Sequence, residues 1–122
     1  MIFSKPMTLY VIRCVTPNHF YVGTTLRDYN IRYQEHKDGY GSRWTARHGC
    51  RNTVTRFTVE CCRSAQKENE VWMFYARRYG PENVRGGDVT ILGPITPSLL
   101  PEEFGGTRRV DWGDGLPEFS RG

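Results

Sequence analysis

Two short segments rich in aliphatic, β-branched and aromatic residues lie close together near the start of the chain, and they constrain its fold more than any other feature. They cover residues 9–15 and 20–24. The residues between them, Thr16-Pro17-Asn18-His19, are of the types that form turns. This pattern predicts a β-hairpin. Because Tyr10 and Tyr21 lie in its two strands, we expect their hydroxyl groups on one face of a small sheet. The alternative is that both are ordinary strand aromatics.

After the hairpin the pattern changes to a helical period over residues 31–37, with Asp28 or Asn30 as the cap. Arg32 and His36 then lie one turn apart on the same helix face. A guanidinium offers a planar fork of donors to two phosphate oxygens, and an imidazole can donate to the same group or shuttle a proton. The pair therefore predicts a phosphate site, although the same spacing also occurs on solvated helix surfaces.

A longer helix is predicted over residues 64–79, with Ser64 as its N-cap and a Gly-Pro pair after its end. Glu68 falls on the apolar stripe of this helix, whereas Glu70 falls at its margin. An inward carboxylate is costly unless it is paired or binds a metal. Mg²⁺ is often held by one or two carboxylates, with water and substrate phosphate completing its shell. Glu68 is therefore a candidate metal ligand, and a buried ion pair with an arginine is the alternative.

Alternation of apolar and polar residues over 54–61 predicts a third strand. We therefore expect an α+β domain in which a small, mainly antiparallel three-stranded sheet is flanked by helices. Residues 1–92 are expected to form this domain. Residues 93–122 are rich in Pro and Gly and are expected to form an irregular arm that packs on the domain or on a partner, with a flexible tail as the alternative.

Charge is unevenly distributed along the 122 residues. Counting Lys and Arg against Asp and Glu, residues 1–87 carry 14 against 7 and residues 88–122 carry 3 against 6. A basic body interleaved with aromatic residues is what a phosphate-binding surface needs, and a solvated basic surface is the alternative. The acidic excess of the arm also allows it to cover the basic face when nucleic acid is absent.

The four cysteines include no Cys-x-x-Cys pair, so we expect free thiols rather than a zinc site or a disulfide framework. The first residues do not have the pattern of a signal peptide, and no apolar stretch is long enough to span a membrane. The expected location is cytoplasmic or nuclear, and not secreted.

These motifs occur in a defined order over residues 8–87. The order is Thr8-Leu9-Tyr10, Tyr21-Val22-Gly23, Arg32, His36, Glu68 and the segment from Tyr79 to Gly87. In this order they resemble the GIY-YIG nuclease family, although Thr8 replaces the glycine of the first motif and Val22 the isoleucine of the second. The resemblance implies the element order β-β-α-α-β-α. It implies a catalytic set of Tyr10, Tyr21, Arg32, His36 and Glu68, with Glu68 as the ligand of one Mg²⁺ or Mn²⁺ ion.

Two choices within the resemblance stay open. Arg27 competes with Arg32 for the family arginine, and Glu70 competes with Glu68 for the family glutamate. The spacing to His36 favours Arg32, and the apolar stripe favours Glu68. Further residues are expected to bind nucleic acid, namely Arg27, Arg43, Trp44, Arg47, Asn83 and Arg85.

The resemblance implies a metal-dependent endonuclease that hydrolyses phosphodiester bonds, with DNA as the expected substrate. In this mechanism Tyr10 helps to take a proton from the attacking water, so a nearby cation must lower the pKa of its hydroxyl group. The alternatives are an RNA endonuclease and a nucleic-acid-binding module that cleaves poorly or only with a partner. The chain is expected to act alone, as a homodimer or with a partner protein.

Overall fold

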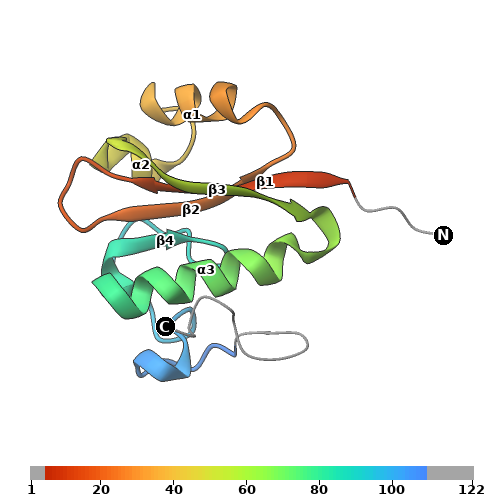
Figure 1. Ribbon diagram of the computed structural model, residues 1–122. Helices are drawn as coiled ribbons and strands as arrows, with labels where there is room; N and C mark the ends of the chain where they lie inside the picture. The colour runs from red at the N-terminus through yellow and green to blue at the C-terminus, as the bar shows by residue number, and fades with distance from the viewer. Residues whose placement is uncertain (1–4, 110–122) are drawn as a thin grey trace.

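The computed structural model describes residues 5–109, and its architecture is α+β (Figure 1). The strands and helices, in chain order, are β1 (Pro6–Arg13), β2 (Phe20–Thr25), α1 (Tyr29–Lys37), α2 (Arg43–His48), β3 (Asn52–Glu60), α3 (Ser64–Tyr79) and β4 (Val84–Gly86). Short 3-10 helices occur at Cys61–Arg63, Pro81–Asn83 and Glu102–Phe104. The predicted α+β class and the predicted hairpin of β1 and β2 are confirmed. Within residues 5–109, the helices are too short or too polar to cross a membrane.

The prediction of a three-stranded, mainly antiparallel sheet is wrong, because the described sheet has four strands in the order β3-β1-β2-β4. β1 is antiparallel to β2 and β3, whereas β4 is parallel to β2. β4 is only three residues long, so it has too few positions to show an alternating pattern. Its pairing with β2 depends on the crossover through α3, which no local pattern reports.

The sheet separates two layers of helices. In Figure 1, α1 and α2 lie on one side of the sheet, and α3 with the arm that follows β4 lies on the other. Asp28 caps α1, because its side chain accepts a hydrogen bond from the Asn30 N–H at 2.8 Å. The predicted range of α3 is confirmed, but Ser64 is not its N-cap: the serine lies within the first turn and donates to the Cys61 carbonyl.

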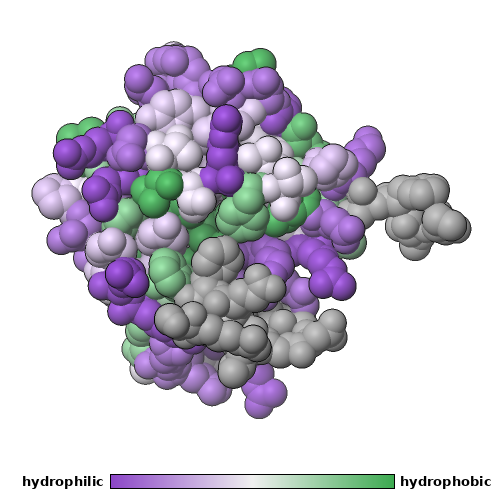
Figure 2. Space-filling model, in the orientation of Figure 1, coloured by the Kyte–Doolittle hydropathy of each residue, from purple (hydrophilic) through white to green (hydrophobic). Residues whose placement is uncertain are grey.

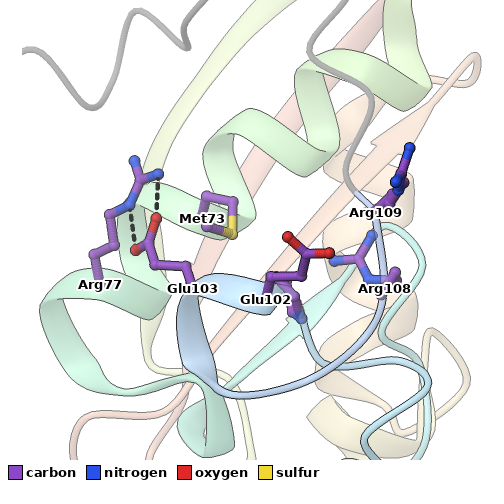
Figure 3. A pocket seen from close by; sticks show the side chains of 7 residues that line it. Met73, Arg77, Glu102, Glu103, Arg108 and Arg109 are labelled. Atoms are coloured by element: carbon purple, nitrogen blue, oxygen red, sulfur yellow. Dashed lines mark hydrogen bonds and ion pairs between the residues drawn. The ribbon is translucent and has the colours of Figure 1, made fainter.

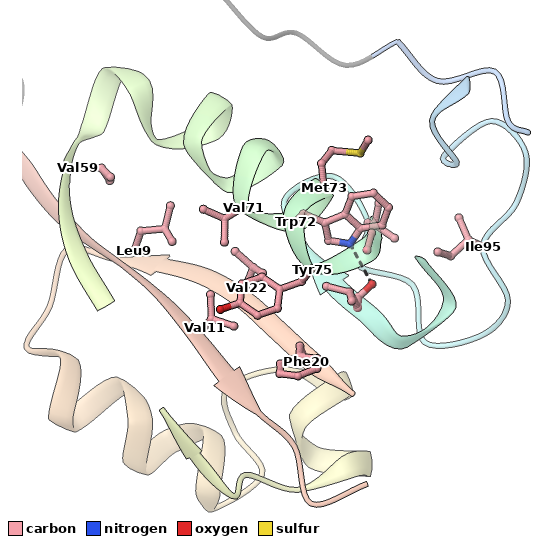
Figure 4. Close-up of a cluster of buried hydrophobic side chains, with 13 residues drawn as sticks. Leu9, Val11, Phe20, Val22, Val59, Val71, Trp72, Met73, Tyr75 and Ile95 are labelled. Atoms are coloured by element: carbon pink, nitrogen blue, oxygen red, sulfur yellow. Dashed lines mark hydrogen bonds between the residues drawn. The ribbon is translucent and has the colours of Figure 1, made fainter. Parts of the chain in front are cut away.

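The larger hydrophobic core lies between the sheet and α3 (Figure 4). Leu9, Val11 and Val22 on the sheet are fully buried against Val71 and Trp72 of α3. Full burial of such side chains stabilises the fold by about 1.5–3 kcal/mol each. The Trp72 indole N–H donates to the carbonyl of Val84 at 2.9 Å. This bond joins α3 to the short strand β4.

A smaller buried cluster lies on the opposite face of the sheet, under α1. It contains Tyr10, Ile12 and Tyr29. Tyr10 is paired with Gly23 across the hairpin, and a Cβ atom on Gly23 would lie 2.6 Å from the Tyr10 hydroxyl oxygen. Any larger residue at this position would therefore displace the Tyr10 ring, so the glycine after Tyr21-Val22 keeps the space that this tyrosine occupies.

The arm packs on the outer side of α3 as far as the structure describes it. Arg77 donates two hydrogen bonds to Glu103, both at 2.7 Å, and the Phe104 ring contacts Trp72 edge-on. A pocket of about 350 Å³ lies between α3 and the arm, and Figure 3 shows the charged side chains that line it. Residues 110–122 of the predicted arm lie outside the described residues, and the division at residue 92 stays a prediction.

Most of the surface seen in Figure 2 is hydrophilic, and apolar side chains lie on it singly or in small groups. The exposed large apolar residues of the described chain are scattered over several elements, namely Val15, Leu26, Ile31, Tyr40 and Val54. Scattered residues of this kind are normal on a protein surface. Charged and aromatic groups are therefore the features of this surface from which a site could be built.

Candidate active site

The centre of the candidate site is a hydrogen bond between two buried side chains, Tyr10 of β1 and His36 of α1. The Tyr10 hydroxyl lies 2.8 Å from Nε2 of His36. Tyr10 is fully buried and His36 is 1% exposed. The alternation of β1 directs Tyr10 towards α1, and the position of His36 near the end of α1 places its ring above the sheet. Two residues 26 positions apart are thus joined by one short bond.

The second ring nitrogen of His36 is held by α2. Nδ1 lies 2.8 Å from the hydroxyl oxygen of Thr45. The same hydroxyl lies 2.8 Å from Oγ of Ser42 and 3.3 Å from the Ser42 carbonyl, and when it donates to Ser42 its oxygen accepts the Nδ1–H of His36. Nε2 of His36 is then unprotonated and accepts the O–H of Tyr10. In this tautomer of His36, Tyr10 is the donor to Nε2.

Thr45 is a site residue that the sequence reasoning missed. Ser42 caps α2, because its side chain accepts a hydrogen bond from the Thr45 N–H at 3.1 Å. The Ser-x-x-Thr spacing before a short helix is a readable signal for a cap. The sequence does not report that the same threonine contacts His36, because this contact depends on how α2 packs against α1.

Arg32 lies beside the Tyr10 hydroxyl and is held from two sides. Its Nε donates to the Tyr10 oxygen at 3.4 Å, and its two terminal nitrogens donate to Glu35 at 2.9 Å and to the Gly41 carbonyl at 3.0 Å. Glu35 is a second residue that we missed, although it follows Arg32 by three positions on the same helix. Of the two competing arginines, Arg32 is the one that contacts Tyr10. Arg27 is exposed and forms a two-bond ion pair with Glu35.

Tyr21 completes the group on this face of the sheet. Its ring centroid lies 5.0 Å from that of His36 and 6.4 Å from that of Tyr10. Burial raises the pKa of Tyr21, the negative charge of Glu68 raises it further, and the positive charge of Arg32 lowers it. The pKa of Tyr21 therefore depends on the charges of both Glu68 and Arg32. The expectation that Tyr10 and Tyr21 share one face agrees with the register, in which Tyr10 faces Gly23 and Tyr21 faces Ile12.

Glu68 lies on α3, and its charge acts on Tyr21 of this group. It is partly buried, and burial raises its pKa to about 7. A hydrogen bond from the Gly87 backbone N–H lowers the pKa, and the charge of Asp88 raises it. Within residues 5–109 Glu68 forms no ion pair, so the alternative of a buried pair with an arginine is not seen there.

Glu70 differs from our expectation. We placed it at the margin of the apolar stripe, and that placement is wrong, because Glu70 is 7% exposed and lies among the buried residues of α3. It forms an ion pair with Lys67 at 3.2 Å. The buried face of α3 is wider than the stripe formed by its apolar residues, since other elements cover the side of the helix that carries Glu70.

The fit of a divalent cation is tested by the ligands present. Among the described residues, no three His, Cys, Asp or Glu side chains are grouped so that they could hold a metal. A single carboxylate is sufficient for Mg²⁺ when water and substrate phosphate complete the shell. Glu68 has this character, because its charged form is destabilised by burial and a cation would offset that cost. The residues fit a one-carboxylate site and do not fit a closed protein cage.

The protonation states at the centre are set mainly by burial. Burial raises the pKa of Tyr10, the charge of Tyr21 raises it further, and Arg32 lowers it by a smaller amount. Burial and the charge of Arg32 lower the pKa of His36 to about 4. At neutral pH Tyr10 is therefore protonated and His36 is uncharged. Arg32 acts in the direction that the mechanism requires, but it does not bring the pKa of Tyr10 down to neutral pH.

Two residues predicted to bind nucleic acid lie in the interior instead. Arg85 is 2% exposed and Trp44 is 5% exposed. The guanidinium carbon of Arg85 lies 4.2 Å from the centre of the Trp44 ring. The nitrogens of Arg85 donate to backbone carbonyls at Pro81, Glu82, Val84, Ile91 and Gly93. Because its donors are occupied in this way, Arg85 is not available to a phosphate, and both residues support the site from inside.

The other predicted contacts are distributed over the surface. Arg43 and Arg47 are exposed on α2. Asn83 is partly buried and donates to the carbonyl of Tyr79 at 2.8 Å, so it supports the end of α3. Arg43 and Arg47 thus remain available for an interface, while Asn83 has a structural partner.

Comparisons with protein-family models, with curated proteins and with solved structures find no match for this chain. The resemblance to the GIY-YIG family therefore stays a prediction, supported by the order of its motifs. The geometry described above does not depend on it.

Proposed function

We propose that this chain is a divalent-metal-dependent endonuclease of the GIY-YIG type that hydrolyses phosphodiester bonds in DNA. The observation that carries the proposal is the buried hydrogen bond between Tyr10 and His36, with Arg32 beside the same hydroxyl. A purely structural tyrosine does not need a base on one side of its hydroxyl and a cation on the other. This arrangement suits a group that passes a proton while negative charge develops nearby.

Tyr10 and His36 together accept the proton of the attacking water. Free deprotonation of Tyr10 is unfavourable, since burial raises its pKa. The Tyr10 oxygen takes a proton from the water as its own proton moves to Nε2 of His36, so that no isolated phenolate forms. His36 starts uncharged because its pKa is about 4. The Thr45 hydroxyl keeps the proton of His36 on Nδ1 and leaves Nε2 open to receive the new one.

Arg32 binds the phosphate in this proposal. A guanidinium has five N–H donors, and three of those of Arg32 are used by Tyr10, Glu35 and Gly41 among the described residues. Two donors remain for phosphate oxygens. Glu35 holds the guanidinium in place, and hydrogen bonds from Arg27 and Arg32 lower the pKa of Glu35 to about 2, so it stays charged. The fixed guanidinium offsets charge on the equatorial oxygens of the phosphate.

Glu68 is the residue that would hold the cation. When Mg²⁺ or Mn²⁺ is bound, it supplies Lewis acidity to the phosphate and to the departing 3′ oxygen. The Glu68 carboxyl must lose its proton to bind a cation, and its pKa is about 7. Cation affinity is therefore expected to rise as the pH increases through 7. Tyr21, whose ring contacts His36 and whose pKa is raised by the charge of Glu68, positions the water or the phosphate.

The test is cleavage of supercoiled plasmid, single-stranded DNA and structured RNA by the purified protein with Mg²⁺ or Mn²⁺. Tyr10→Phe is expected to slow cleavage by about 10²–10⁴-fold, which is the usual contribution of a proton-transfer group. Tyr33→Phe is the matched control, because Tyr33 also lies near the site, on α1, and no partner of its hydroxyl is seen among the described residues.

Glu68→Gln is expected to abolish the response to metal, whereas Glu60→Gln at the exposed end of β3 should leave it intact. Cleavage that persists in Tyr10→Phe and Glu68→Gln would contradict the mechanism. If the wild-type protein binds all three polymers and cuts none of them, the protein is a binding module. Preferential cutting of RNA would show that RNA, and not DNA, is the substrate.

A further inference from the structure

A second site candidate lies beside the first, in a groove that the proposed mechanism does not use. The groove has a volume of about 430 Å³, and the residues that line it include His19, Trp44, Arg47, His48 and Glu82. We call it the α2–β4 groove, since its walls come mainly from α2 and from the segments around β4.

Three aromatic rings are packed together at this groove, and two of them are stacked. The His19 and Trp44 rings are nearly parallel, at 18°, with centroids 5.4 Å apart. His48 lies 4.4 Å from His19 and 4.2 Å from Trp44, again between ring centroids. Trp44 also carries the guanidinium of the buried Arg85 over its ring. Trp44 is therefore held in place by an internal cation, while both histidines are partly exposed.

The sheet places this stack next to the candidate active site. Tyr21 of β2 is paired in parallel register with Arg85 of β4. Paired residues of neighbouring strands point to the same face and lie about 5 Å apart. Trp44 covers Arg85, and its neighbour Thr45 holds His36. One strand spacing thus separates Tyr21 from Arg85, the residue that supports these rings. In α2, Trp44 is adjacent to Thr45, which belongs to the His36 network.

The polar groups of the groove suit a heterocyclic ligand. Nδ1 of His19 donates to the carbonyl of Pro17 at 2.8 Å, which leaves Nε2 as the second polar atom of the ring. Burial lowers the pKa of His48, so its ring is uncharged at neutral pH. The indole N–H of Trp44 has no acceptor among the described residues. Exposed side chains of both charges, Arg47 and Glu82, complete the lining.

We propose that the α2–β4 groove binds one unpaired nucleobase of the nucleic acid, next to the phosphate that is cleaved. The proposal rests on the proposed function and adds a preference for an unpaired nucleotide. Rings on which bases stack, with a nearby cation for the backbone, are how proteins hold single-stranded nucleic acid. A paired base has both faces covered by its neighbours and cannot stack on His19 or His48. Arg47 contacts the adjoining phosphate.

The experiment measures binding of Glu68→Gln protein to a short single-stranded DNA by fluorescence anisotropy, so it does not depend on cleavage. In a series of oligonucleotides, each nucleotide in turn is replaced by an abasic one. The proposal expects one position at which loss of the base weakens binding by about tenfold, within the range known for base stacking on aromatic side chains. At that position 2-aminopurine should lose fluorescence when the protein binds. This arm uses an unmodified groove, so it cannot fail because a variant does not fold.

The second arm adds His19→Ala and His48→Ala together to the Glu68→Gln protein. These changes are expected to weaken binding of the intact oligonucleotide by about tenfold and to abolish the effect of the abasic position. Binding to a fully paired duplex should change by less than about threefold. Arg63→Ala is the control, because Arg63 is exposed beside α3 and outside the groove. Equal binding of all abasic oligonucleotides, or equal losses for duplex and single strand, would overturn the proposal even if the wild-type protein cuts DNA.

Discussion

The two faces of the sheet are formed by the same strands, but one buries apolar side chains and the other buries polar ones. Towards α3, β1 directs Leu9 and Val11 into an apolar core that also contains Trp72. Tyr10, which lies between Leu9 and Val11 in β1, points towards α1 and α2. There it enters a buried polar network with His36. Apolar burial is stabilising without directional demands, whereas buried polar groups are tolerated only when their partners are placed correctly.

The two faces of the sheet have different roles. A core of Leu, Val and Trp supplies free energy of folding but no group that can bind or transfer a proton. The network of Tyr10, His36 and Thr45 supplies such groups, and it must be supported by a stable scaffold. We therefore expect changes in the apolar core under α3 to reduce stability and changes in the Tyr10–His36 network to reduce activity. Glu68 of α3 is the exception, because it is the residue that would hold the cation.

The largest stability effect is expected for Trp72→Ala on the α3 face. Removal of a fully buried tryptophan costs about 3–5 kcal/mol in the free energy of unfolding. The Val84 carbonyl also loses its indole donor. By contrast, Tyr10→Phe removes one hydroxyl and should cost no more than about 2 kcal/mol. Urea unfolding of the two variants measures both values. If Tyr10→Phe is the more destabilising, the assignment of stability to the α3 face is wrong.

An effect of intermediate size is expected on the way the free energy of unfolding changes with pH. It comes from His36 and Glu68. Burial lowers the pKa of His36 from 6.5 to about 4 and raises the pKa of Glu68 from 4.5 to about 7. Between pH 4.5 and 6.5 the unfolded chain holds an extra proton at His36, and the folded chain holds an extra proton at Glu68. Acidification therefore destabilises the fold through His36 and stabilises it through Glu68, by up to about 1.4 kcal/mol per pH unit each.

Glu68→Gln removes the contribution of Glu68 to the pH dependence of the free energy of unfolding and leaves the opposing contribution of His36. Between pH 6.5 and 4.5 the variant should lose about 2 kcal/mol more of its unfolding free energy than the wild-type protein. Urea unfolding at the two pH values, with Glu60→Gln as the control, checks this. Parallel losses in the variant and the wild type would show that Glu68 is not buried as described. Neither pH value is below 4.5, so the Glu35 ion pairs stay intact, because hydrogen bonds from its arginines lower the pKa of Glu35 to about 2.

A stability effect smaller than that of Trp72→Ala is also expected for Thr45→Val, which keeps the shape of the side chain and removes the hydroxyl that holds His36. One buried donor, Nδ1–H of His36, loses its acceptor, which costs about 1–3 kcal/mol. Cleavage should fall by at least about tenfold, since the tautomer of His36 is no longer held. Thr45→Ser keeps the hydroxyl and should retain most of the stability and most of the cleavage activity. Normal cleavage by Thr45→Val would show that the His36 tautomer does not matter.

Local patterns were sufficient where the site depends on spacing within one element or one hairpin. The two-residue period of the strands placed Tyr10 and Tyr21 on one face, and the helical period placed Arg32 and His36 on another. The range of α3 could also be predicted, because it has a regular period and a Gly-Pro end. Such features need only neighbouring residues to be specified.

Local patterns failed where burial depends on segments that are distant in the sequence. Arg85 was expected to bind nucleic acid, but carbonyls from residues 91 and 93 accept its hydrogen bonds inside the protein. Glu70 was expected at the margin of the stripe and is buried. The charge of a residue indicates that burial is costly, but it does not indicate whether another segment supplies the partners that offset the cost.

The sequence by itself determined the hairpin, the long helix and the ordered set of tyrosines, arginine, histidine and glutamate. Only the tertiary structure decided that β4 joins the sheet, that Thr45 and Glu35 hold the central residues, and that burial governs the protonation of Tyr10 and His36. The physical reason is that periodicity is a property of neighbouring residues. Desolvation and hydrogen-bond satisfaction are properties of the whole packed chain.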